Sequence, residues 1–413
     1  MTELNSREND PLPTDLSRSE NESVPIFSSG TDTDVIALEN RDFVQDLSAE
    51  QSRPDTCPPS VVAVDSPPSM SRGIGEAMGW LFGAWLVHVI AAVCIGILLI
   101  IRLIVNNVAS GKVQPMNLDD SNSTMIITTG EMVLFVLAAI LAVALRYRGR
   151  MFNELNFTRP DSRHIWIVVA ATLPLTFCIA IWSVPTQLAW DSIVEMFPAL
   201  KMIDGMNVNE EIKRMADSTP LLLMIFSIAV LPAIGEELIF RGAIGRTLIA
   251  NLGLWSGILL TSFLFGWFHV HPVHAISVMP LGLVMHVVYL WTRSFWLPML
   301  LHFVNNCWAI IVAHFSKTEH VIDGGSLNLL EGLQMITAII AVIALGFGLW
   351  QSRVRLVRED GSVLDPGRFP LRVPTGPGVH RQSNPMNPWC WKLALVSSAL
   401  CHALVVFELV NPR

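Results

Sequence analysis

The stretch TPLLLMIFSIAVLPAIGEELIFRGAIGRTLIA, residues 219–250, is long and apolar enough to span a bilayer and carries a Glu-Glu-x-x-x-Arg cluster within it. A membrane-spanning helix needs about 20 predominantly apolar residues. Ionisable side chains inside such a run are costly, at roughly 2.5 kcal/mol or more for a charged one, and are functional candidates by default. The stretch therefore predicts a membrane helix with candidate functional residues at Glu236, Glu237 and Arg241.

The composition of the whole chain agrees with lipid surroundings. Of 413 residues, 52% are hydrophobic and 15% are charged, whereas a soluble domain carries about 25% charged residues. The apolar runs predict an all-α, polytopic membrane bundle. The number of transmembrane helices is eight or nine, because Pro272 and Pro280 interrupt one long run and the last run is separated from the others. The runs lie at about 78–105, 124–145, 164–183, 219–250, 254–272, 274–292, 295–316, 331–350 and 389–410.

Charge is concentrated before the first apolar run. Residues 1–72 contain 14 acidic residues and five arginines, for a net charge of −9, while the whole chain carries −8. A segment rich in Ser, Thr, Pro and acidic residues buries too little apolar surface to offset the entropy of ordering. We therefore predict a disordered acidic N-terminal tail, whose charge indicates nothing about the substrate of the main body.

Basic loops predict the orientation. One group of arginines follows the second apolar run and another follows the eighth, and excess Arg and Lys favour the cytoplasmic side. Six predicted spans separate the two groups, an even number, so both can face the cytoplasm, with the N-terminal tail inside and Arg413 outside. The groups are Arg146, Arg148, Arg150, Arg159 and Arg163, and Arg353, Arg355, Arg358, Arg368, Arg372 and Arg381.

The first polar cluster contains a candidate general base. Glu237 and Arg241 are i,i+4 neighbours on a helix and can pair. Glu236 is rotated by about 100° from Glu237, which leaves its carboxylate free, as a general base requires. The alternative is a helix end at the membrane interface with all three charges solvated, because Pro232 could end the span early.

The second cluster contains a candidate catalytic histidine. Phe265 and His269 share one helical face. A single histidine on an apolar helix is more often a hydrogen-bonded core residue. His271 and His274 follow closely, so a metal-binding H-x-H-x-x-H pattern is a second alternative, although Pro272 breaks the helix there.

The third cluster contains two candidate hydrogen-bond donors. His302 and Asn306 are i,i+4 neighbours in the run 295–316. Two aligned donors could stabilise an oxyanion, while the alternative is a polar clamp between helices. Together the three clusters supply a base, a histidine and a donor pair in successive helices.

These residues resemble the motifs of the CPBP family of intramembrane proteases, also called the ABI or CAAX prenyl protease 2 (Rce1-like) family. The family motifs EExxxR, FxxxH and HxxxN/D match Glu236–Arg241, Phe265–His269 and His302–Asn306, in that order. The resemblance covers about residues 215–316 and implies about eight packed helices around a cavity within the membrane.

The resemblance also implies roles for the matched residues. Glu236, with His269, would activate a water for attack on a peptide carbonyl, and His302 and Asn306 would stabilise the oxyanion. Arg241 would hold Glu237 in a supporting pair, with Phe265 also supporting. No cofactor is firmly predicted. Zinc is not favoured, because H-E-x-x-H is absent from the sequence; if a metal were bound, its ligands would be Glu236, His269 and His302.

The expected function is therefore an intramembrane endopeptidase in a multi-pass protein of the cell inner or plasma membrane. Its partners would be the lipid bilayer and a membrane-associated protein or peptide substrate, not nucleic acid. One alternative is a non-catalytic scaffold or bacteriocin self-immunity protein with the same fold. Another is a transporter or a haem- or metal-binding protein that uses His88, His269, His286 and His302.

The expected organisation of the chain places the protease-like core in its middle. The predicted parts are the disordered tail 1–72, N-terminal transmembrane helices and outer loop 73–213, catalytic core 214–316, an additional transmembrane helix 317–350, a Pro- and Arg-rich cytoplasmic linker 351–388 and a C-terminal apolar helix 389–413.

Overall fold

The computed structural model describes residues 69–111, 121–204, 208–216, 218–315, 329–363 and 379–410. All of these belong to one compact unit, residues 67–413. The predicted disordered tail lies outside the described residues, apart from its last few positions, where the structure corrects the boundary. Helix α2 begins at Met70 and includes them.

Among the described residues, eight helices are long and apolar enough to cross a membrane, which confirms the all-α polytopic fold. Leu221–Leu252 is a single continuous helix composed of five labelled segments. The other seven are α2 (Met70–Ser110), α3 (Ser121–Arg146), α5 (Ser162–Met196), α12 (Pro272–Thr292), α13 (Trp296–Phe315), α14 (Leu329–Gln351) and α15 (Pro388–Val410).

The predicted span at 254–272 is shorter than expected. Its helix, α11, covers only Leu254–Trp267, or about 21 Å at 1.5 Å per residue, which is less than the roughly 30 Å hydrocarbon core. Pro272, which was expected to interrupt this run, occupies the first position of α12, where its missing N–H does no harm. The chain therefore turns back at residues 268–271, inside the bundle.

The outer loop expected at the end of the part 73–213 is largely helical where the structure describes it, which corrects that expectation. Helix α5 continues past Pro185 to Met196. Three short helices follow, η2 (Pro198–Leu200), α6 (Lys201–Asp204) and α7 (Val208–Ala216). A single proline inside a membrane helix is tolerated when neighbouring groups satisfy the backbone carbonyl that it leaves free.

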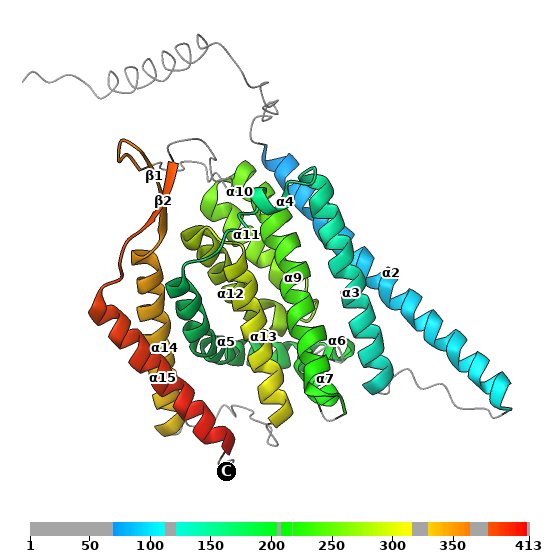
Figure 1. The fold of residues 1–413 in the computed structure, drawn as a ribbon. Coiled ribbons are helices and arrows are strands. Elements are labelled where there is room, and N and C mark those ends of the chain that lie inside the picture. Colours follow the sequence, from blue (N-terminus) through cyan, green and yellow to red (C-terminus); the bar gives the residue numbers. More distant parts are fainter. Residues whose placement is uncertain are drawn as a thin grey trace, which may run out of the picture. The chain divides into compact units, whose positions relative to one another are not determined.

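Both basic segments lie at the same end of the bundle, as their spacing predicts. The first contains the short helix α4 (Met151–Glu154), and the second contains an antiparallel pair of strands, β1 (Val354–Arg358) and β2 (Val379–Ser383), where only a linker was expected. Arg163 donates to the Ser383 hydroxyl at 3.0 Å, and Arg381 donates to the Arg293 carbonyl at 3.0 Å. Figure 1 shows the strands and α4 at the same end of the bundle.

The helix Leu221–Leu252 lies at the centre of the bundle. Its most apolar window is 61% buried, against 11% for α2. Helices α3 and α13 both contact its middle segment, α9 (Leu231–Glu237), as Figure 1 shows. The polar cluster predicted from the sequence is thus placed in the best-shielded part of the fold.

Candidate active site

The central helix contains two π-helical segments around the Glu-Glu pair. These are η3 (Ile225–Val230) and η4 (Leu238–Ile244), with α8 (Leu221–Met224) before them and α10 (Gly245–Leu252) after them. The helix continues through Pro232 and does not end there, so the interfacial alternative for the cluster is wrong. π-Helical turns are rare and occur often at functional sites, and nothing in the apolar pattern predicted them.

Glu237 is the centre of a buried polar cluster. Its Oε1 accepts from Arg241 Nη1 at 2.8 Å and from His302 Nδ1 at 3.0 Å. The Glu237 and Arg241 side chains are both 0% exposed. Arg241 Nη2 donates to the Gly282 carbonyl at 2.9 Å, and its guanidinium lies 4.7 Å from the centre of the Phe265 ring. This cluster joins the central helix to α12, α11 and α13.

Glu236 has a different environment from Glu237. Glu236 is 5% exposed and makes no hydrogen bond with any described residue, and its Oε2 is fully shielded. Glu237 Oε2 also lacks a partner, but Glu237 is anchored through Oε1. A buried carboxylate with no partner is an expensive group in a membrane helix.

Phe265 separates and contacts the two candidate catalytic histidines. Its ring centre lies 5.3 Å from that of His269 and 5.9 Å from that of His302, edge-on to both. His269 Nδ1 is 3.0 Å from the Phe265 carbonyl oxygen, which can only accept, so Nδ1 carries the hydrogen. In neutral His269 the atom with a free lone pair is therefore Nε2.

Asn306 does not pair with His302, although the two are i,i+4 neighbours. Its Nδ2 donates to the Ile228 carbonyl at 3.0 Å, and its Oδ1 accepts from Asn305 at 3.2 Å. Residue 232 would normally bond the carbonyl of residue 228, but proline has no N–H. Asn306 thus satisfies a carbonyl that Pro232 leaves free, and this contact has the form of the interhelical clamp considered as the alternative.

The two histidines that follow His269 do not form a metal-binding cluster with it. His274 lies 4.8 Å from His269 between ring centres, whereas His271 contacts Trp190 at 6.0 Å. In the part of the chain that the structure describes, no group of three or more His, Cys, Asp or Glu side chains has an arrangement that could hold a metal ion. This applies to Glu236, His269 and His302 and to the H-x-H-x-x-H pattern.

The three motifs did not predict the buried polar pair that α2 and α3 form. His88 Nδ1 lies 2.5 Å from Glu131 Oε1, and both side chains are mostly buried. The available signal was an ionisable residue in each of two apolar runs, but their pairing required knowledge of how α2 packs on α3. Both residues precede the segment that carries the three motifs.

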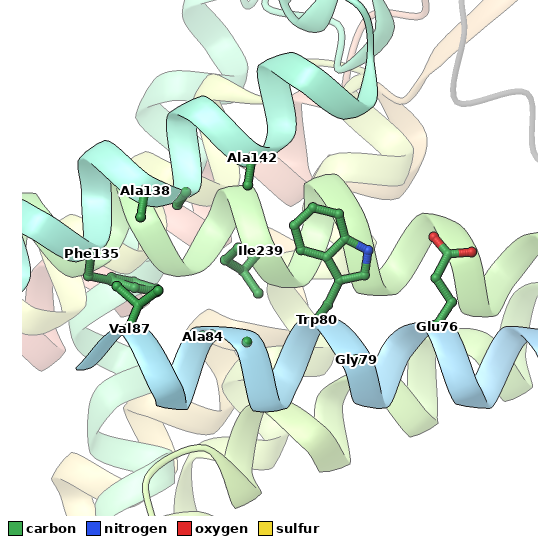
Figure 2. Close-up of a pocket in the computed structure, with 11 residues that line it drawn as sticks. Glu76, Gly79, Trp80, Ala84, Val87, Phe135, Ala138, Ala142 and Ile239 are labelled. Carbon is green, nitrogen blue, oxygen red and sulfur yellow. The ribbon is translucent and has the colours of Figure 1, made fainter. Parts of the chain in front are cut away.

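An apolar groove of ≈ 520 Å³ runs between α2 and α3 beside the central helix. Figure 2 shows Glu76 and Trp80 toward one end of the groove and Val87 and Phe135 toward the other. Gly79 and Gly83 contribute open space to its wall, because a Cβ at either would contact nothing within 4 Å. Phe135, at one end of the groove, packs against Gly235, the residue before Glu236.

Comparison with known proteins gives one family. Residues 218–308 match the model of the type II CAAX prenyl endopeptidase Rce1-like family. No curated protein and no solved structure matches the chain. The match includes all three motifs, from Glu236 to Asn306, and the family is one of membrane proteases. The central segment of this chain, residues 218–308, is therefore similar to the Rce1-like family of type II CAAX prenyl endopeptidases.

Proposed function

We propose that this protein is an intramembrane endopeptidase, with Glu236 as the general base of peptide hydrolysis. The observation that carries the proposal is the contrast between two adjacent buried carboxylates. Glu237 is held by Arg241 and His302, while Glu236 has no hydrogen-bond partner among the described residues. A base must be able to accept a proton from water, and only Glu236 is free of ion-pair partners.

The proposed reaction begins with a water between Glu236 and the substrate carbonyl. Glu236 removes a proton from this water. The oxygen of the water attacks the carbonyl carbon, and a tetrahedral oxyanion forms. Glu236 then returns the proton to the leaving nitrogen as the carbon–nitrogen bond breaks. His269 supports the water through Nε2, the atom that its bond to the Phe265 carbonyl leaves available.

The oxyanion is stabilised from α13 in this proposal. His302 in its protonated form donates from Nε2, while Nδ1 stays bonded to Glu237. Asn306 contributes the N–H that its bond to the Ile228 carbonyl does not use. Loss of one such donor typically lowers kcat by about 10²–10³-fold, so these roles are separable from the base role in kinetics.

The groove between α2 and α3 supports a membrane-associated substrate. Its lining is almost entirely apolar, and Phe135 at one end packs against Gly235, the residue before the proposed base. We assign it to an apolar part of the substrate that enters from the lipid. The arginine-rich end, with the N-terminal tail, is assigned to the cytoplasmic side of a cell inner or plasma membrane.

The test is cleavage of candidate membrane peptides by purified wild-type protein and variants in lipid nanodiscs. Glu236→Gln preserves size and removes the base, so cleavage should fall by at least about 10²-fold. His269→Ala should also reduce it. His402→Ala is the matched control. His402 lies on α15, forms hydrogen bonds to Ser398 in its own helix and has a ring contact with Trp308. Full activity in both site variants would overturn the mechanism.

A further inference from the structure

The first observation concerns a polar pair that the proposed mechanism does not use. His88 on α2 and Glu131 on α3 are joined by a 2.5 Å contact between Nδ1 and Oε1. Their side chains are 14% and 21% exposed. Two ionisable groups in membrane helices are costly unless they pair or serve a function. The pair alone could be a clamp between α2 and α3, so its surroundings decide.

The second observation is that His88 packs against two aromatic rings, one that precedes His269 in the sequence and one that packs against Gly235. The His88 ring centre is 4.1 Å from that of Phe135 and 5.4 Å from that of Phe268. Phe135 packs against Gly235, where an added Cβ would be 2.6 Å from its ring. Gly235 is followed by Glu236, and Phe268 is followed by His269. His88 is therefore linked through one aromatic ring to the residue before each candidate catalytic group or is in contact with that residue itself.

Depth in the membrane agrees with this placement. His88 lies 18 residues after the first residue of α2, and Glu236 lies 16 residues before the last residue of the central helix. Both of those helix ends are at the same end of the bundle, where Ser69 donates to Asn251. At 1.5 Å per residue the two side chains are about 27 and 24 Å from that end.

The third observation concerns two polar atoms that lack partners. His88 Nε2 and Glu236 Oε2 are both shielded and both without a hydrogen bond to any described residue. With Glu131 ionised, Nδ1 carries the hydrogen of neutral His88, and Nε2 is an acceptor. Buried polar groups that do not meet directly are commonly bridged by water.

We propose that His88, oriented by Glu131, is a positioning residue of the active site that is linked through one water to the Glu236 carboxyl group. The proton that Glu236 takes from the attacking water can then be shared with Nε2. The imidazolium so formed lies between two carboxylates, Glu131 and Glu236. The proton returns through Glu236 to the leaving nitrogen, so no proton is gained or lost over the reaction.

The inference rests on the proposed function and extends it to helices outside the matched segment. The groups that surround His88 and Glu236 are Glu131 on α3, Glu237 and Arg241 on the central helix, His269 after α11 and His302 on α13. Glu237, Arg241 and His302 already bond one another. His88 does not take part in that set of bonds. It is a mostly buried histidine, and its contact with Glu131 fixes its orientation.

The kinetic test uses full-length protein in nanodiscs and a membrane peptide that the wild type cleaves. His88→Asn should lower kcat by at least about tenfold with KM changed less than about twofold, because it disturbs Glu236 and not substrate binding. Glu131→Gln, which can still accept from Nδ1, should lose less. His402→Asn should behave as wild type. In a Glu236→Gln background, His88→Asn should cause no further loss.

A structural clamp would give a different pattern. In that case His88→Asn would lower the free energy of unfolding, would change the yield of folded protein, and would add its full effect on rate in the Glu236→Gln background. Either equal losses in both backgrounds or an unchanged kcat for His88→Asn overturns the inference.

A second measurement does not depend on cleavage. In protein labelled with ¹⁵N-histidine, the His88 resonances, assigned with His88→Asn, should shift in Glu236→Gln and in Glu131→Gln but not in His402→Asn. Unchanged His88 resonances in Glu236→Gln would overturn the link even in an active enzyme. Shifted resonances with no cleavage of any peptide would instead count against the proposed function and leave the link supported.

Discussion

Asn306 donates to the backbone carbonyl of Ile228 at 3.0 Å, four residues before Pro232, which has no N–H to donate. In lipid no water replaces a missing backbone hydrogen bond, so each free carbonyl is expensive. The contact also ties α13 to the π-helical segment η3, which precedes the Glu-Glu pair by a few residues. One asparagine therefore compensates the proline and fixes the distance between two motif-bearing helices.

This relationship predicts a stability effect separate from catalysis. Asn306→Ala should destabilise the protein by about 1–3 kcal/mol, because the Ile228 carbonyl loses its partner. In a Pro232→Ala background residue 232 regains an N–H, and the cost of Asn306→Ala should shrink. Unfolding of the purified protein in mixed detergent micelles measures both. Equal costs in the two backgrounds would show that Asn306 does not act through this carbonyl.

The Glu237–Arg241 pair predicts opposite behaviour from Glu236. Both side chains of the pair are 0% exposed, and removal of one partner leaves a buried uncompensated charge that costs about 3–5 kcal/mol. Glu237→Gln should therefore lower the yield of folded protein and the free energy of unfolding, whereas Glu236→Gln should leave both nearly unchanged. Thermal unfolding of the two isosteric variants in one detergent provides the comparison. A stable Glu237→Gln variant would contradict the anchoring role.

The spacing of residues within a helix was enough to predict contacts within that helix. The i,i+4 interval from Glu237 to Arg241 predicted a pair that the structure contains. Contacts between helices were beyond this reasoning. His302 bonds Glu237 across 65 positions, and His88 meets Glu131 across 43. Apolar periodicity shows which residues tolerate lipid but not which helices become neighbours.

Prolines within the apolar runs were poor indicators of where a helix ends. Pro280 was expected to interrupt an apolar run, and Pro232 would have ended its helix in the alternative interpretation, yet both lie inside continuous helices. The reason is that another part of the chain can bond the freed carbonyl, as Asn306 does for Ile228. Pro272 does mark a helix boundary, because it follows a short helix and begins the next one. A proline in a membrane run is thus interpretable only with its neighbours in space.

The groove between α2 and α3 predicts an effect on substrate affinity. Gly83 lines it, and a side chain there meets no other atom within 4 Å of its Cβ, so Gly83→Leu should fold and fill part of the ≈ 520 Å³ space. KM for a membrane peptide should rise while kcat changes little. Gly96→Leu is the control, because Gly96 is also on α2 with open space beside it but does not line the groove. Equal KM values for the two variants would exclude the groove as part of the substrate site.

The turn between α11 and α12 carries backbone strain beside His269. Val270 has a φ of 64°, a left-handed conformation that is unusual for a β-branched residue. Such a conformation costs roughly 1–2 kcal/mol for an ordinary L-residue, and asparagine tolerates it better. Val270→Asn should therefore raise the free energy of unfolding by up to about 1 kcal/mol, since the Val270 side chain is 56% exposed and little packing is lost.

The same substitution separates strain from geometry at the site. His269 and His271 are held by the backbone of this turn, where His271 N–H donates to the His269 carbonyl at 2.6 Å. If the turn keeps its shape, Val270→Asn should leave kcat for peptide cleavage within about twofold of wild type while thermal unfolding shifts upward. Val270→Ala is the matched comparison, because it shortens the side chain but keeps the left-handed penalty, and it should not stabilise. A fall in stability for Val270→Asn, or equal gains for both variants, would mean that strain at this residue does not limit the turn.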